Sequence, residues 1–277
     1  ITPTLGDVPA NLRKHLEYVR QARARGVDLL IFPELSLTGY SLGDRAFDVA
    51  IRAAAGDPTF DSLLAASEEL DLVFSFVEVD ARQRHFISAA YLSGGRVVHH
   101  HRKIYLPSYG LWNEGRNFAH GDRARAFDTR FGRMGLLICE DFWHASLPYL
   151  LWQDGAEVLI LISASLEHGL GDAVSTAGKV QAITTAYALQ FTTFVIHVNQ
   201  TGDDPSGTFW GGSTILGPDA EMLTQGPPEE VLVVGCIDTA QLVPARRNLP
   251  LLRDERPDLV VRELVRILEI RDWRLGD

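Results

Sequence analysis

The sequence has very little cysteine: only Cys139 and Cys236 occur among its 277 residues. Two thiols are too few for the disulfide framework of a small secreted domain, so we expect a reducing, cytoplasmic environment. The chain also lacks any apolar run long enough to span a bilayer, and its start shows no signal-peptide pattern. We therefore expect no membrane partner.

An excess of basic residues is absent as well. The chain carries 26 Lys and Arg against 36 Asp and Glu, which gives a formal net charge of −10. Proteins that bind nucleic acid or anionic membranes usually concentrate Lys and Arg, so we expect no nucleic-acid partner. With 46% hydrophobic and 22% charged residues, the chain has enough apolar residues for a full core and enough charge for a wetted surface.

Segments with helical and strand periodicity alternate along much of the chain. We predict helices at 7–25, 60–71, 145–155, 175–190 and 256–270. We predict strands at 27–32, 72–79, 85–92, 96–101, 156–163, 192–199, 211–216 and 230–238, with one more that ends at Cys139. Because no repeat, low-complexity tract or linker divides the chain, we predict one mixed α/β domain over residues 1–277, with helices layered outside the strands.

Three polar side chains stand where predicted strands end. Glu34 follows LLIFP, Lys103 follows VVHHHR and Cys139 follows GLLI. Reactive groups of α/β enzymes tend to lie at strand ends, and the three would meet at one edge if their strands shared a sheet. A thiol nucleophile, a carboxylate that takes and returns its proton, and an ammonium that stabilises an oxyanion form a set for covalent catalysis. The backbone N–H of Glu140 is a candidate second oxyanion donor.

Each of these residues also has a simpler interpretation. A free cysteine in a strand most often fills core space, and a lone Glu or Lys at a strand end is usually solvated. We interpret Cys236, within VLVVGCID, as such a core residue. A papain-like Cys–His enzyme is an alternative because the chain has nine histidines, but no CGSCW-type sequence surrounds Cys139.

The run His99-His100-His101 raises the alternative of a metal site. Adjacent side chains in a strand point to opposite faces, so all three cannot converge on one ion. His99 and His101 could share a face, but no Cys or carboxylate lies at a familiar ligand spacing. SGGR at 93–96 and WGGS at 210–213 lack the Lys-Ser/Thr ending of a phosphate loop, and we interpret both as turns. We therefore predict neither a metal nor an organic cofactor.

Three blocks of the sequence resemble the signature blocks of the nitrilase, or carbon–nitrogen hydrolase, superfamily. They are FPELSLTGY (32–40), HRKIYLPSYGLWNEGRNF (101–118) and LLICEDFW (136–143), and they occur in the family's order. FWGGSTILGPDAE (209–221) fits the same family, so the resemblance covers essentially the full length. It implies a four-layer αββα sandwich, a Glu–Lys–Cys triad, a small-molecule amide substrate, a homodimer or higher homo-oligomer, and a strand ahead of Ile1.

The resemblance also implies roles for individual residues. Cys139 would be the nucleophile, Glu34 the general base and then acid, Lys103 the oxyanion stabiliser and Glu114 the glutamate that orients the site. The long gap from Lys to the second Glu, the CED-W block and SAS at 163–165 are similar to the glutaminase domain of glutamine-dependent NAD synthetases. By that pattern the substrate pocket would be lined by Tyr40, Tyr109, Glu140, Trp143 and Ser165.

Two features differ from a complete synthetase. The sequence contains no ATP-pyrophosphatase loop of the SGGxDS type, and no Lys or Arg follows SAS until Lys179. Without a cation, the α-carboxylate of glutamine would be poorly paired in a closed pocket. We therefore predict hydrolysis of a carboxamide through a Cys139 thioester, with glutamine less favoured. The alternatives are a nitrilase with the same residues, a separate-subunit glutaminase that supplies ammonia to a synthetase partner, and a non-catalytic interaction module.

Overall fold

The protein is described by a computed structural model over residues 1–168 and 175–275. Its first large sheet contains, in spatial order, β1 (Leu29–Ile31), β2 (Asp71–Val79), β3 (His85–Ser93) and β4 (Arg96–Arg102). The second contains β12 (Met222–Gln225), β11 (Thr214–Leu216), β8 (Phe194–Asn199), β7 (Val158–Ser163), β6 (Gly132–Ile138) and β5 (Phe127–Thr129). A separate ribbon is formed by β9 (Thr201–Asp204) and β10 (Gly207–Trp210).

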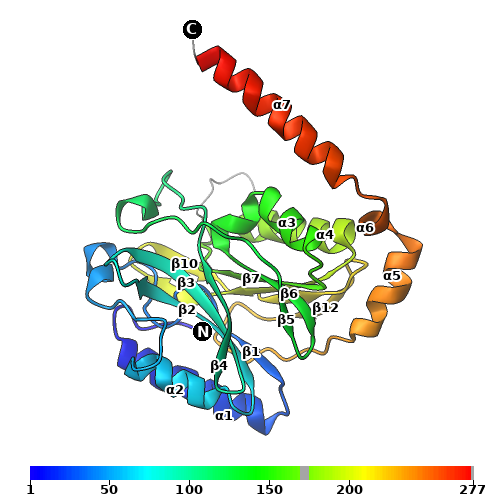
Figure 1. Ribbon diagram of the computed structural model, residues 1–277. Coiled ribbons are helices and arrows are strands. Elements are labelled where there is room, and N and C mark those ends of the chain that lie inside the picture. Colours follow the sequence, from blue (N-terminus) through cyan, green and yellow to red (C-terminus); the bar gives the residue numbers. More distant parts are fainter. Residues whose placement is uncertain (169–174, 276–277) are drawn as a thin grey trace.

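Helices cover the outer faces of both sheets. The first sheet is covered by α1 (Val8–Ala24) and α2 (Pro58–Ala66), and the second by α3 (Ser146–Gln153) and α4 (Thr176–Phe191) (Figure 1). The predicted αββα sandwich is therefore confirmed. The chain then continues through α5 (Leu242–Asn248) and α6 (Leu251–Asp254) to α7 (Pro257–Leu275), which extends away from the sandwich (Figure 1).

Acidic or hydroxyl side chains cap the first turns of α1, α2 and α4. Asp7 accepts a hydrogen bond from the N–H of Ala10 at the start of α1, and Asp57 accepts from Thr59 and Phe60 at the start of α2. Such caps satisfy N–H groups that have no partner inside the helix. The sequence periodicity and these caps together explain why the observed helices lie close to the predicted ranges.

Apolar side chains form three large hydrophobic clusters between the four layers. The central cluster fills the space between the two sheets and includes Val73, Tyr91, Leu136 and Ile160, all buried. Two further clusters join each sheet to its own helices. Burial on both faces explains why β2, β6 and β7 are nearly continuous apolar runs rather than alternating ones.

Gly135 in β6 sets how closely α3 can approach the second sheet. A Cβ atom at this position would lie 2.7 Å from Cδ1 and 3.1 Å from Cβ of Leu151, so a larger residue would force the Leu151 side chain to move. This close approach fixes β6, which leads directly into Cys139, against its covering helix.

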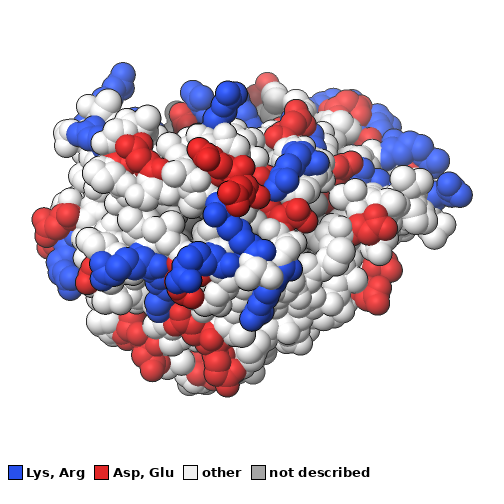
Figure 2. Space-filling model, turned by 90° about the horizontal axis from the view of Figure 1, so that it is seen from below, with Lys and Arg blue, Asp and Glu red and all other residues white. Residues whose placement is uncertain are grey.

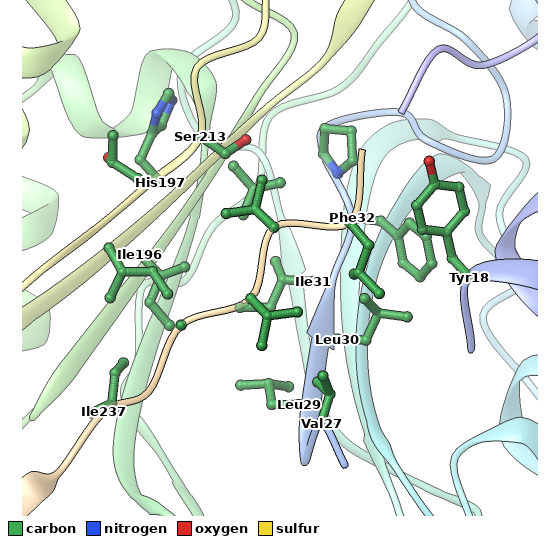
Figure 3. A pocket seen from close by; sticks show the side chains of 18 of the residues that line it. Tyr18, Val27, Leu29, Leu30, Ile31, Phe32, Ile196, His197, Ser213 and Ile237 are labelled. Carbon is green, nitrogen blue, oxygen red and sulfur yellow. The ribbon is translucent and has the colours of Figure 1, made fainter. Parts of the chain in front are cut away.

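One predicted strand and one predicted core residue are wrong. Residues 230–238 form no strand, and Cys236 is exposed rather than buried. The segment instead covers a cavity of about 640 Å³ beside β1, whose mostly apolar lining includes Ile31, Ile196 and Ile237 (Figure 3). The apolar residues of this segment line the cavity. Glu34, Lys103 and Cys139 are not among the lining residues.

The surface gives two further observations. On the face seen from below in Figure 1, acidic and basic side chains are interspersed (Figure 2). Helix α7 carries exposed apolar side chains, among them Val261, Leu264 and Leu268. In the part of the chain that the structure describes, no helix is both long enough and apolar enough to cross a membrane.

Candidate active site

Glu34, Lys103 and Glu114 form a buried ionic cluster. The Nζ atom of Lys103 lies 2.7 Å from Oε1 of Glu34 and 2.8 Å from each carboxylate oxygen of Glu114. Glu34 and Lys103 have no exposed surface, and Glu114 is 7% exposed. Buried charges persist when they are paired, and this ammonium has two carboxylates around it.

Cys139 lies beside this cluster. It packs against the central hydrophobic cluster that also contains Leu35 and contacts Tyr40, and its pKa responds to burial and to the charges of Glu34, Lys103 and Glu114. The structure therefore brings together the four residues for which sequence analysis predicted catalytic roles.

These residues come from both sheets rather than from one, which corrects the expected arrangement. Glu34 follows β1 and Lys103 follows β4, both in the first sheet, whereas Cys139 follows β6 in the second. The two sheets pack face to face, so strand ends from both meet at the same end of the sandwich. The predicted proximity holds for a different geometric reason.

The backbone is strained next to two of these residues. Cys139 itself and Leu35, which follows Glu34, both have a φ of 48°. Non-glycine residues rarely adopt such left-handed values, which cost about 1–3 kcal/mol each and concentrate at functional sites. At Cys139 the chain turns from β6 into a 3₁₀ helix, Cys139–Trp143, so the thiol stands at the corner.

The electrostatics of the cluster follow from burial and from opposite charge. Burial alone would lower the pKa of Lys103, but Glu114 and Glu34 outweigh it and hold that pKa well above its usual value. Burial raises the pKa of Glu114 to about 7, against the opposing effect of Lys103. Burial and the charge of Glu34 raise the pKa of the Cys139 thiol well above its usual range. The resting thiol therefore keeps its proton at neutral pH.

Two tyrosines predicted to line the pocket make defined contacts. The hydroxyl of Tyr40 donates to Oε1 of Glu114 at 2.7 Å, which joins Tyr40 to the ionic cluster. The hydroxyl of Tyr109, a residue 47% exposed, donates to the carboxylate of Glu140 at 2.9 Å. Tyr109 and Glu140 thus form a second polar pair one residue along the chain from the thiol.

Ser165 is held by Asn199, a residue that sequence analysis missed. Asn199 Oδ1 accepts from the N–H of Ser165 at 2.8 Å, and its Nδ2 donates to the carbonyl of Ser165. The preceding N–H, of Ala164, donates to Oε2 of Glu34 at 2.9 Å. Asn199 ends β8, so the strand-end rule that selected Glu34 could also have selected it.

Asp141 is a second residue whose contacts were not predicted in detail. Its buried carboxylate accepts from the N–H groups of Ile104 and Tyr105, directly after Lys103, and from the N–H of Ile138, directly before Cys139. The ring of His101 also donates to it, at 2.8 Å.

Trp143, a further predicted pocket residue, is partly buried and is the last residue of the 3₁₀ helix that carries Cys139 and Asp141. Trp143 packs against the hydrophobic cluster of α3 and α4, whereas Cys139 and Tyr40 pack against the central cluster. The stretch without basic residues that follows Ser165 includes 169–174, which lie outside the described residues.

The three consecutive histidines contact three different partners. His99 stacks on Phe127 with ring centroids 4.1 Å apart, Nε2 of His100 lies 3.0 Å from Glu78, and His101 meets Asp141. Among the described residues, no group of three or more His, Cys, Asp or Glu side chains is arranged to hold a metal ion. The alternation of side chains along β4 accounts for this separation.

A family model for carbon–nitrogen hydrolases matches residues 1–247. The chain belongs to this family. An (R)-stereoselective amidase of Pseudomonas sp. is 31% identical over 255 residues, which is 91% of this chain and 87% of that protein. The predicted superfamily is therefore confirmed, and the amidase among its relatives supports the predicted class, a hydrolase of carbon–nitrogen bonds.

Two further similarities bear on the fold and on the length. The glutamine-dependent NAD(+) synthetase of Acinetobacter baylyi is 28% identical over 228 residues, which is 82% of this chain and 40% of that protein. The chain thus spans about 40% of the length of this relative. The crystal structure of a carbon–nitrogen hydrolase from Helicobacter pylori matches with a TM-score of 0.84 at 23% identity, covering 95% of this chain and 96% of that one, and supports the fold.

Proposed function

We propose that this carbon–nitrogen hydrolase cleaves a small-molecule carboxamide through a thioester on Cys139 and releases ammonia or an amine. The observation that carries the proposal is the buried contact of Lys103 with Glu34 and Glu114 beside a partly exposed thiol. A nucleophile, a base and a fixed cation within one cluster are the parts that acyl transfer requires.

In the first half-reaction Glu34 accepts the proton of Cys139 as the sulfur attacks the amide carbon. The carbonyl oxygen becomes an oxyanion, stabilised by the ammonium of Lys103 and the backbone N–H of Glu140. Because the pKa of the thiol is raised, proton transfer accompanies attack rather than preceding it. Glu34 then returns the proton to the nitrogen, the carbon–nitrogen bond breaks, and the amine leaves a thioester on the sulfur.

In the second half-reaction water replaces the amine. Glu34 accepts a proton from water, whose oxygen attacks the thioester carbon and forms a second oxyanion at the same position. Collapse breaks the carbon–sulfur bond, and the proton held by Glu34 returns to the thiolate. The sum is amide plus water to carboxylic acid plus amine, with the enzyme restored.

Glu114 and Tyr40 hold the cation in this scheme. Glu114 contacts the ammonium of Lys103 through both oxygens and accepts from Tyr40 through one of them. This leaves the ammonium fixed between two carboxylates, so it needs little reorganisation when an oxyanion forms.

The substrate would be bound by Tyr40, Tyr109, Glu140, Trp143 and Ser165. Glu140 directly follows Cys139, and its carboxylate, held by the hydroxyl of Tyr109, adds a negative charge beside the thiol. An acyl group with a carboxylate near this position would be repelled. We therefore favour neutral or cationic acyl groups over anionic ones.

A second candidate is a glutaminase that supplies ammonia to a synthetase partner. The similarity to the Acinetobacter baylyi NAD(+) synthetase over 40% of that protein favours it. Ammonia release from glutamine that rises on addition of a synthetase would support this candidate over a free-standing amidase.

We also propose that the enzyme is at least a homodimer in the cytoplasm. The exposed apolar side chains of α7, including Val261, Leu264 and Leu268, support assembly, and the presence of only two cysteines in the sequence supports a reducing location. Light scattering of the protein and of a Leu264→Glu, Leu268→Glu variant tests the assembly, because the variant should have the smaller mass.

A panel assay tests the reaction itself. Ammonia release should be measured with short aliphatic amides, glutamine, asparagine, ω-amides, N-carbamoyl amino acids and nitriles. We expect release from at least one amide, and none from the same amide with Cys139→Ala. Release from nitriles alone would replace the amidase proposal with a nitrilase.

A further inference from the structure

Asp141 joins the two polypeptide segments that carry Lys103 and Cys139. Its Oδ1 accepts from the N–H groups of Ile104 and Tyr105, each at 2.9 Å. Its Oδ2 accepts from the N–H of Ile138 at 3.2 Å and from Nε2 of His101 at 2.8 Å. One buried carboxylate thus receives four hydrogen bonds.

These contacts cross from one sheet to the other. His101 and Lys103 belong to β4 and its end in the first sheet, while Ile138 and Cys139 belong to β6 and its end in the second. The two sheets pack together through contacts between apolar side chains, and such contacts impose no direction. Hydrogen bonds to Asp141 add a fixed direction and register at the point where the ammonium and the thiol must meet.

We propose that Asp141, together with His101, is a positioning residue that sets the distance between the Lys103 ammonium and the Cys139 thiol. It acts through the backbone on either side of these residues. The inference rests on the proposed function, because the distance that Asp141 sets matters for oxyanion stabilisation and thiol activation.

A carboxylate is required at this position because all four neighbours are donors. An ionised carboxylate only accepts, with capacity for all four bonds. An asparagine has the same shape, but in either orientation its NH₂ group faces N–H donors. Asp141→Asn therefore keeps the packing and loses two of the four bonds, or one where the His101 ring changes tautomer and accepts from the NH₂ group.

His101 contributes one donor in a fixed orientation. Its side chain is 1% exposed, so solvent does not compete for the ring. Glutamine can present an N–H at a similar reach, whereas leucine cannot. His101→Gln should therefore preserve the hydrogen bond to Asp141, and His101→Leu should remove it.

The test measures turnover and the reactivity of the thiol. The kcat and KM of Asp141→Asn are determined with the best amide of the panel. Alkylation of Cys139 by iodoacetamide is followed from pH 6 to pH 10 in a Cys236→Ser background, which leaves one thiol. The charges that act on this thiol are those of Lys103, Glu34, Glu114 and Glu140.

Asp71→Asn is the matched control. Asp71 is also a buried carboxylate, and it accepts from Tyr91, Ser93 and Arg130. It lies near the end of β3 opposite to Lys103, since the N–H of Lys103 bonds to Ile87 near the other end of that strand. Its amide variant removes the same charge far from the thiol, while the hydroxyls of Tyr91 and Ser93 can accept from the new NH₂ group.

We expect Asp141→Asn to lower kcat by about 10²-fold with little change in KM, as a displacement of about 1 Å can do. The alkylation midpoint should move to higher pH, because Lys103 then stabilises the thiolate less. Asp71→Asn should leave both readouts unchanged, and His101→Gln should retain more activity than His101→Leu.

Equal effects of Asp141→Asn and Asp71→Asn, or an unshifted alkylation midpoint in folded Asp141→Asn, would overturn the proposal. If Asp141→Asn does not fold, the two His101 variants decide: indistinguishable kcat values and midpoints would overturn it. Full turnover by Cys139→Ala would instead overturn the thioester mechanism, while the alkylation profiles would still report on Asp141.

Discussion

Nζ of Lys103 lies 2.7 Å from Oε1 of Glu34, and neither side chain has exposed surface. Removing two charges from water is costly, and their attraction compensates only when further partners complete the geometry. Here Glu114 supplies the second carboxylate for the ammonium, and the N–H of Ala164 supplies a donor for Glu34. Lys103 is the one cation that the two carboxylates share within this cluster, so losing it leaves both without a counter-charge there.

Lys103→Met should abolish turnover and destabilise the fold. The two carboxylates would lose their shared cation, and breaking a buried pair costs about 3–5 kcal/mol. The loss should be larger at pH 8 than at pH 5. Without Lys103, the pKa of Glu114 in the folded state rises further above its pKa in the unfolded chain. The loss of folding stability therefore grows as the pH rises above the unfolded-chain pKa. Urea unfolding at both pH values measures it.

Lys14→Met is the control for this variant. Lys14 pairs with Glu230 at the partly exposed surface, where such pairs contribute about 0–1 kcal/mol. It should keep full activity. An equal loss of stability at pH 5 and pH 8 in Lys103→Met would contradict the account of the cluster.

Tyr40→Phe should reduce kcat by about tenfold, equivalent to about 1.4 kcal/mol. The change removes the hydroxyl that donates to Glu114, and the pKa of Glu114 should rise above about 7 because that bond favours the ionised form. Steady-state kinetics across pH 6–9 measures both effects. Tyr18→Phe, at a partly buried tyrosine that lines the cavity beside β1, should behave as wild type, and an unchanged kcat in Tyr40→Phe would show that Tyr40 does not support the cluster.

Stability should fall as pH falls from about 6.5 towards 3. Burial lowers the pKa values of His15, His99 and His197 to about 3, so below 6.5 the unfolded chain binds protons that the folded chain does not. Glu114 opposes this between about 4.5 and 7, because there the folded state holds the extra proton. The decline should therefore be steeper below about pH 4.5.

Urea unfolding from pH 7 to pH 4 measures this dependence. His197→Gln removes one titrating ring, so its curve should be flatter than that of the wild type. A slope identical to wild type would mean that His197 does not remain neutral in the folded state.

Much of the fold could be predicted from periodicity and strand-end chemistry. The hairpin of β3 and β4 and the strand that leads to Cys139 appear where the pattern placed them. The strand predicted at 230–238 was wrong because apolar residues in this pattern indicate a segment that packs on others. The pattern does not distinguish a strand from a segment that lines a cavity. Cys236 was assigned to the core on that same pattern.

The site was predictable as a set of residues but not as a geometry. Strand-end positions selected Glu34, Lys103 and Cys139, yet the sequence does not say which sheet a strand joins. The hydrogen bonds of Asn199 to Ser165, and those of Asp141 to His101, Ile104 and Tyr105, depend on that packing, because these partners lie more than 30 residues away in the chain. Local patterns carry no signal for such contacts.

The thioester on Cys139 is tested most directly by intact mass measured within milliseconds to seconds of mixing the enzyme with its best amide. The thioester mechanism predicts a mass increment equal to the acyl group. The increment should be absent in Cys139→Ala and retained in Cys236→Ala, with ammonia or amine released at the same time. Turnover with no increment on wild type, together with undiminished turnover by Cys139→Ala, would contradict it.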